Sequence, residues 1–186
     1  LTIGFMSGAF AYGSEGERLS YTIHPLGGRA EYCDLGIREL DGRRVQLSTF
    51  TTDTFGFKDR ETIYSDPETS LPIKVLRDVC SWFSRTIIVE DYDQEAFTVT
   101  IRKYKGDRLI DETVKTADGP ITNPILAAFY TRTADGLREG WSVDLNTPAR
   151  FRVTLAGIED LRVHGRTYQA YHFVSDPDKF EMWVSA

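Results

Sequence analysis

Apolar and polar residues alternate along most of this chain, which is the pattern of strands that bury one face. The clearest example is residues 97–102, where Phe, Val and Ile alternate with Thr, Thr and Arg. The chain also predicts strands at residues 19–23, 29–40, 43–52, 58–65, 71–82, 86–90, 109–115, 141–145, 151–155, 168–174 and 180–185. Their spacing is that of an antiparallel protein whose strands are joined by hairpins.

Short turn sequences separate the predicted strands. Asp41-Gly42 is the strongest of them, because Asp-Gly favours the two-residue turns that match the twist of a hairpin. Gly27-Gly28 and residues 105–107 are further hairpin turns, and residues 66–70 are rich in turn-forming Asp, Pro and Ser. Residues 54–57, Thr-Phe-Gly-Phe, interrupt the alternation as an irregular aromatic segment.

One stretch has the period of a helix. Asn123 is a suitable N-cap, and Pro124 follows at the first helical position, where its missing N–H costs nothing. Apolar residues at positions 125, 126, 129 and 130 then share one face. A helix over residues 123–132 is too short to be stable alone, so it must pack on the sheet.

These patterns predict a mainly β protein with one strongly curved antiparallel sheet, or a partly open barrel, of roughly ten strands. One short helix at about 123–132 covers the sheet. The chain has 186 residues, which suits a single β domain over residues 16–186.

Residues 1–11 form an uncharged apolar stretch that ends in Ala-Phe-Ala. This composition is typical of the core and cleavage site of a secretory signal, so we interpret it as a signal-peptide remnant and expect an exported protein. The alternative is a first strand with an apolar face. The stretch is too short to cross a bilayer, and no transmembrane segment is predicted.

Charge and cysteine content narrow the classes of partner. The net charge is −6, which argues against nucleic acid or an anionic membrane surface as a partner, and acidic and basic residues are interleaved with no basic run. Cys33 and Cys80 are either one disulfide or two buried thiols. They form no Cys-x-x-Cys motif, and the sequence predicts no metal site and no cofactor.

No catalytic motif is recognisable. The chain lacks a Gly-x-Ser-x-Gly elbow and a glycine-rich phosphate loop. His172 lies in an alternating strand, and we interpret it as a hydrogen-bonded core residue. Asp59-Arg60-Glu61 is interpreted as a solvated strand face, with charge pairing across strands as an alternative. We therefore predict that the protein is not an enzyme.

Several aromatic residues lie in or beside irregular segments and on the predicted helix. They are Phe55, Phe57, Trp82, Phe83, Phe129, Tyr130 and Trp141. Two interpretations are open: the rings fill the core, or they line an apolar cavity between helix and sheet that holds a hydrophobic ligand.

The order of short motifs resembles the domain of unknown function 3108 family of bacterial cell-envelope proteins. The motifs are Gly-Glu-x-Leu-x-Tyr at 16–21, Asp-Arg and Tyr-Ser-Asp within 59–66, Leu-Pro at 71–72, the helix at 123–132, Leu-x-x-Gly at 137–140, Val-x-Gly and Tyr-x-Ala within 163–170, and Trp-Val-Ser at 183–185. The resemblance implies export to the periplasm and a mostly antiparallel fold, but no activity.

Two differences from the family pattern stand out. Asn123 replaces an Asp that often precedes the helical Pro, and we interpret it as an equally good cap. The chain also stops soon after Trp-Val-Ser, where the family continues with a further strand, so a C-terminal truncation is expected.

The functional hypothesis is a non-catalytic, exported envelope domain that binds an apolar ligand or a lipidated partner. The alternative is a protein–protein interaction module that uses an exposed strand edge or face.

Overall fold

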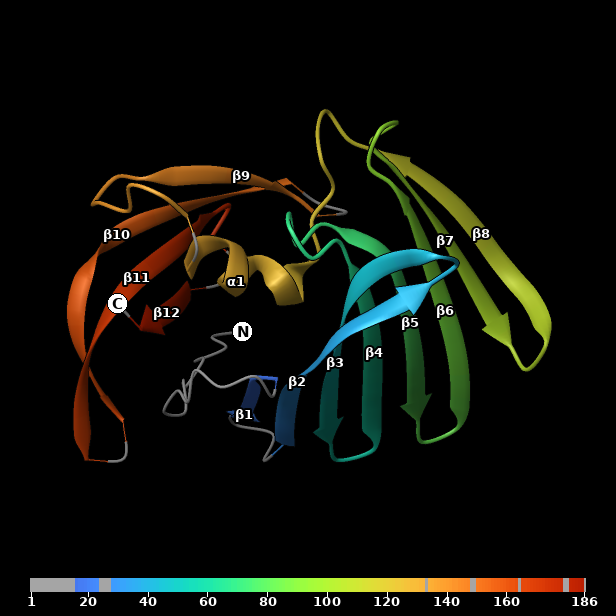
Figure 1. Ribbon diagram of the computed structural model, residues 1–186. Coiled ribbons are helices and arrows are strands. Elements are labelled where there is room, and N and C mark those ends of the chain that lie inside the picture. The colour runs from blue at the N-terminus through green and yellow to red at the C-terminus, as the bar shows by residue number, and fades with distance from the viewer. Residues whose placement is uncertain are drawn as a thin grey trace. The chain divides into compact units, whose positions relative to one another are not determined.

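The computed structural model describes residues 16–23, 28–132, 134–147, 150–163, 165–178 and 181–185 (Figure 1). The predicted signal remnant at 1–11 and the predicted Gly27-Gly28 turn lie wholly or partly outside these ranges. The fold is mainly β, as predicted, with one short helical segment. The described residues form two compact units, one up to Ile121 and one from Thr122 onward.

The first unit is an eight-stranded antiparallel meander, in which every strand pairs with its neighbours in the chain. Its strands are β1 (Arg18–Ile23), β2 (Gly28–Leu40), β3 (Arg43–Thr54), β4 (Phe57–Ser65), β5 (Pro72–Ser81), β6 (Ser84–Asp93), β7 (Thr98–Lys105) and β8 (Arg108–Thr116). The predicted Asp41-Gly42 turn is confirmed: both residues have positive φ, and Leu40 pairs with Arg43.

The second unit is a four-stranded antiparallel sheet in the order β12-β11-β10-β9. Its strands are β9 (Ser142–Asn146), β10 (Arg150–Val163), β11 (Arg166–Asp176) and β12 (Glu181–Ser185). Its core brings together Leu145, Val153, Leu155, Phe173 and Met182. These side chains pack together as the core of this unit.

The prediction of one strongly curved or nearly closed sheet is wrong, because the strands divide into sheets of eight and four. Hairpin turns predict which consecutive strands pair, but they do not say where a sheet ends. The division falls between β8 and β9, where the helical segment separates the two strands.

The helical segment lies where the sequence predicts it. It consists of a 3-10 turn, η1 (Pro124–Leu126), followed by α1 (Ala127–Arg132). Asn123 caps it, since its side-chain Oδ1 accepts a hydrogen bond from the Ile125 N–H at 2.8 Å. Ala127 belongs to the core of the second unit, and α1 packs against β12.

Register defines two faces of the eight-stranded sheet. Ser48, Ile63, Val75, Glu90 and Ile101 follow one another across β3 to β7, and the first three are buried. We call the face of this row the buried face. Most buried residues of the sheet share it, namely Ala30, Tyr32, Ser48, Asp59, Ile63, Val75 and Val99.

The two cysteines are free thiols, so the disulfide alternative is wrong. Cys33 lies on β2 and Cys80 on β5, three strand spacings away. At about 4.8 Å per spacing the separation across the strands alone is roughly 14 Å, beyond the reach of an S–S bond.

Candidate functional site

Four of the seven predicted aromatic residues gather at one end of the eight-stranded sheet. Phe55 lies in the turn between β3 and β4, and Phe57 is the first residue of β4. Trp82 and Phe83 form the turn between β5 and β6. The two turns are adjacent because Phe57 pairs with Ser81. We call these four aromatic residues the aromatic tip.

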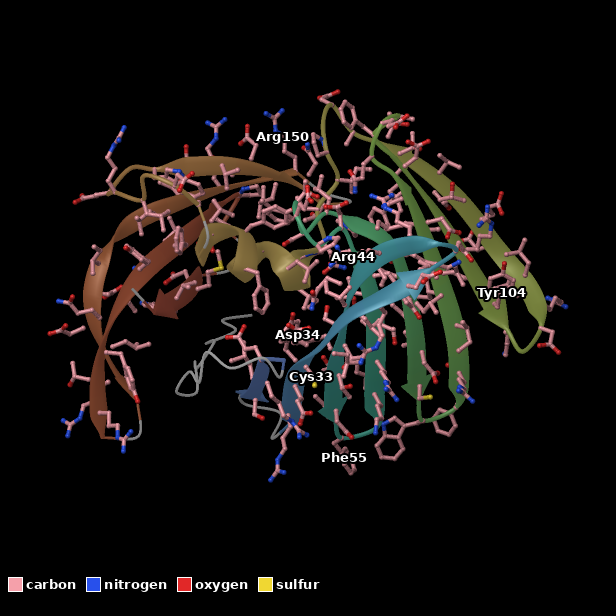
Figure 2. The ribbon with its side chains drawn as sticks, in the orientation of Figure 1. Cys33, Asp34, Arg44, Phe55, Tyr104 and Arg150 are labelled. Carbon is pink, nitrogen blue, oxygen red and sulfur yellow. The ribbon has the colours of Figure 1, made fainter. Side chains whose placement is uncertain are left out.

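The rings of the aromatic tip are presented to solvent. Phe83 is 97% exposed, Phe55 85% and Trp82 61%. Figure 2 shows Phe55 projecting beyond the end of its strands. A single exposed apolar residue is common, but three large rings on two neighbouring turns form a patch of the kind that marks an interaction site.

The rings of the aromatic tip pack on each other and on the backbone of the neighbouring turn. Gly56 has φ +76°, and a Cβ placed on it would lie 1.2 Å from Trp82 Nε1, so the indole occupies the space that a side chain would take. Phe55 meets the same indole edge to face, with ring centroids 4.8 Å apart. Edge-to-face pairs are favourable beyond the area they bury. Because residue 56 has no side chain, the turn between β3 and β4 leaves room for the indole of Trp82 from the turn between β5 and β6.

Hydroxyl groups close both turns. Thr54 Oγ1 donates to the Phe57 carbonyl at 3.3 Å, and the Ser81 and Ser84 hydroxyl oxygens lie 2.8 Å apart. These bonds satisfy polar groups locally and leave the rings as the outermost atoms of the turns.

A cationic row lies next to the aromatic tip, on the face opposite the buried face. Register places Arg29, Asp53, Lys58, Cys80 and Arg85 side by side across β2 to β6. Three cations and one carboxylate give the row a net charge of +2, in a chain whose net charge is −6. Asp78, which binds Arg85, lowers the net charge of the row with this partner to +1, so the charge beside the exposed rings remains positive.

Two cations of this row, Arg85 and Lys58, are held in ion pairs. Arg85 binds Asp78 through two hydrogen bonds of 2.8 and 2.6 Å, which lower the pKa of the Asp78 carboxyl and raise that of the guanidinium. Lys58 Nζ lies 3.5 Å from an Asp53 carboxylate oxygen. Both pairs are solvent-exposed, so the cations remain available to a further anion.

The other three predicted aromatic residues belong to the second unit. Trp141 packs against its core and meets Phe173 edge to face at 6.2 Å. Phe129 and Tyr130 lie on α1, and both are half-buried. The seven residues therefore separate into two groups on two compact units. In the second unit the core-filling interpretation holds for Trp141.

A charged network crosses the buried face of the first sheet. Arg77 Nη2 donates to Asp59 Oδ2, and Arg77 Nε lies 3.5 Å from Glu61 Oε1. Nearby, Tyr92 donates to Glu90 Oε2 at 2.6 Å, and burial, followed by the charge of Glu90, raises the pKa of Tyr92. The interpretation of this segment as a solvated strand face is wrong for Asp59, which is buried, and the alternative of charge pairing across strands is confirmed.

His172 is hydrogen-bonded, as predicted, but its ring lies on the face opposite Phe173 and the core. Its Nδ1 is 2.7 Å from Glu159 Oε1 and its Nε2 is 3.0 Å from Glu181 Oε2. The ring stacks on Trp183 at 4.5 Å. This arrangement uses both ring nitrogens in structural contacts.

Across the described ranges, no three His, Cys, Asp or Glu side chains are grouped to hold a metal ion.

The sequence interpretation missed the cationic row. Arg29, Lys58 and Arg85 are far apart in the chain, and register alone brings them into line. Counting outward from the two turns of the aromatic tip would have found Lys58 and Arg85.

No helix in the described part of the chain is long and apolar enough to span a membrane.

Comparison with known proteins adds no relatives: no family model, no curated protein and no solved structure matches the chain. The resemblance to the domain of unknown function 3108 family therefore stays a prediction from its motifs.

Proposed function

We propose that this chain is a non-catalytic binding domain that docks on an anionic lipid surface by inserting its aromatic tip. The observation that carries the proposal is the exposure of Phe55, Trp82 and Phe83 on two adjacent turns. The sequence predicts an apolar ligand or a lipidated partner, and its net charge of −6 argues against an anionic surface for the chain as a whole. A projecting patch nevertheless fits a lipid surface, whereas a soluble ligand needs a concave site that encloses it.

The chemistry of the rings favours the interfacial layer of a bilayer. Trp and Phe are typical of segments that bind at the boundary between headgroups and acyl chains. The turns contribute no charged side chain, since residues 54–57 and 81–84 are Thr-Phe-Gly-Phe and Ser-Trp-Phe-Ser. Insertion therefore brings no charge into the apolar region.

The cationic row supports an anionic surface as the partner. Arg29, Lys58 and Arg85 lie one residue row behind the turns, at the depth where headgroup phosphates would sit. Each cation near an anionic leaflet contributes about 1 kcal/mol, and salt screens this contribution. The row therefore favours phosphatidylglycerol over phosphatidylcholine.

The expected binding is reversible. Full burial of a large apolar side chain yields roughly 1.5–3 kcal/mol, so three rings supply about 5–9 kcal/mol before the cost of association. This suits a peripheral protein that exchanges between solution and membrane.

Vesicle flotation with tryptophan fluorescence tests the proposal. We expect the protein to float with vesicles that contain phosphatidylglycerol, with a blue shift of the emission. The shift should disappear in Trp82→Phe, since Trp141 is packed in the core and Trp183 is stacked on His172. The variant F55A/W82A/F83A should stay in solution.

Ile158→Ala is the matched control, because it removes an exposed apolar side chain from the other unit. This variant should float like the wild type. Flotation of the triple variant, or no flotation of the wild type, contradicts the proposal. A lipid that stays bound to the triple variant in native mass spectrometry would instead indicate an enclosed site.

We also propose an exported location in the bacterial cell envelope. The composition of residues 1–11 and the motifs shared with the domain of unknown function 3108 family support it. A fusion of the chain to alkaline phosphatase, which is active only after export, tests this location.

A further inference from the structure

Strand β8 ends the eight-stranded sheet (Figure 1). All nine of its residues are exposed, and no strand of the described chain pairs with its outer edge. It is longer than the other edge strands, β1 with six residues and β9 and β12 with five each. Its outer row of N–H and C=O groups is a template for a further strand.

The regular part of β8 runs from Asp111 to Thr116. Register with β7 shifts where Tyr104 pairs with Leu109 but Lys103 pairs with Asp111, which leaves Ile110 as an extra residue in a bulge. Beyond the bulge the pairing is continuous, and this stretch contains no proline. It is therefore suited to regular pairing on its outer side.

The charges on this stretch have a symmetric order. Asp111, Thr113 and Lys115 share one face of the sheet, since they pair with Lys103, Ile101 and Val99 in turn. A carboxylate and an ammonium group thus flank Thr113, each two residues away. Turning the strand by 180° about Thr113 exchanges the two charges.

We propose that β8 pairs antiparallel with β8 of a second copy of this chain, with Thr113 opposite Thr113. A two-fold axis perpendicular to the sheet keeps each residue on the same face of the sheet in both copies. Residues opposite each other also share a face, so the axis must pass between a residue and the same residue of the second copy. With the axis at Thr113, Asp111 of each copy lies opposite Lys115 of the other. Opposite charges placed this way stabilise cross-strand pairs.

Neighbouring registers are less favourable. An axis at Asp111 or at Glu112 sets two carboxylates directly against each other, which is destabilising. An axis at Val114 brings together Val114 with Val114, but it sets Asp111 and Lys115 against uncharged residues. The charge order therefore selects the register centred on Thr113, as complementary charges do in other specific strand and helix pairings.

Asp111 can take part without losing its contact within the chain. Lys103 Nζ donates to Asp111 Oδ2 at 2.8 Å, and a carboxylate accepts more than one such bond. In the dimer, Asp111 of one copy would therefore contact Lys103 of its own copy and Lys115 of the second copy. The two-fold axis repeats this arrangement on its other side. Because the interface is one strand wide, we expect a reversible dimer that depends on concentration.

Sedimentation velocity over a range of concentrations tests the pairing. We expect a monomer–dimer equilibrium in the wild type, and in Asp111→Lys and Lys115→Asp a dissociation constant about tenfold higher, because like charges then face each other. The double variant D111K/K115D should restore the dimer. Since Asp111→Lys removes the contact with Lys103 in both the single and double variants, only pairing between copies explains a recovery.

A cysteine at the axis gives a second measurement. In a C33S/C80S background, Thr113→Cys should form a disulfide-linked dimer under mild oxidation, since residues directly opposite bring their Cβ atoms within about 5.5 Å. Arg108→Cys, at the far end of β8, is the control and should stay monomeric. A monomer at every concentration, or a double variant that associates no better than the single ones, overturns the proposal. Association lost in F55A/W82A/F83A but unaffected by the charge exchange would assign self-association to the aromatic tip and overturn it too.

Discussion

The indole of Trp82 lies over Gly56, with its Nε1 where a Cβ on that glycine would be. The relationship joins two turns that are 26 residues apart in sequence (82 − 56). It fixes the ring that we propose to enter the lipid interface, and it makes the shape of the aromatic tip depend on the smallest residue of the chain.

We expect Gly56→Ala to destabilise the protein and to displace Trp82. The new Cβ would clash with the indole, and φ +76° is strained for any L residue with a side chain. Gly42→Ala is the control, because Gly42 has φ +78° but open space around its Cβ position. Each variant should lose about 1–2 kcal/mol from backbone strain, and only Gly56→Ala should also change Trp82 fluorescence. Equal unfolding midpoints and unchanged fluorescence would contradict this.

Loss of Arg77 should be costly. Arg77→Met leaves Asp59 and Glu61 without their cation on the buried face, and breaking a buried pair typically costs 3–5 kcal/mol. Because the Arg77 side chain is 31% exposed, we expect a loss near the lower end, about 3 kcal/mol, in urea unfolding. Arg85→Met breaks the exposed pair with Asp78 and should cost much less. Similar losses in the two variants would contradict the assignment of a buried network.

The cap of the helical segment supplies a third test. Asn123→Ala should lower the free energy of unfolding by about 1 kcal/mol, because the Ile125 N–H loses its acceptor, while Asn123→Ser keeps one. Asn123 is only 3% exposed, so Asn123→Asp would bury a charge and should also destabilise the protein at neutral pH. If Asn123→Asp unfolds at the same urea concentration as the wild type, Asn and Asp are equally good caps at this position, and the expected cost of a buried charge is wrong.

A pH-dependent contribution comes from Asp144 in the second unit. Hydrogen bonds from Arg152 and then from Arg150 lower the pKa of its carboxyl from 3.8 to about 2. A depressed folded-state pKa means that the stabilisation is fully present above about pH 4 and is lost as the pH falls towards 2. Asp144→Asn should therefore unfold at a lower temperature than the wild type near pH 6, and the difference should shrink as the pH falls and vanish below about pH 2. A difference that does not change with pH would point to another cause.

The sequence was most informative where local chemistry decides the structure. Asp41-Gly42 and the Asn123-Pro124 start of the helical segment are confirmed because turn and cap preferences act over a few residues. The strand at 97–102 is also confirmed, but Phe97 lies in the preceding turn with φ 51°.

Features that depend on register were not predictable from local pattern. Local pattern predicts only an irregular segment at the Phe55-Gly56 turn, since Phe is not a usual turn residue, and it predicts a strand that includes Trp82, which the structure places in the next turn. Their contact depends on the alignment of β4 with β5. The burial of Asp59 is not predictable from local pattern for the same reason. Its partner Arg77 lies on β5, and only the pairing of β4 with β5 brings the two side chains together.

The order of strands in both sheets has a consequence for how the chain folds. Every sheet neighbour is also a neighbour in the chain, from β1 to β8 and again from β9 to β12. Each pairing therefore closes only a short loop, and proteins dominated by such local contacts fold faster than other β proteins of similar size. As the chain leaves the ribosome, each new strand can add to an edge that is already formed, so that the sheet grows in the order of synthesis and β8 completes the first unit before the second begins.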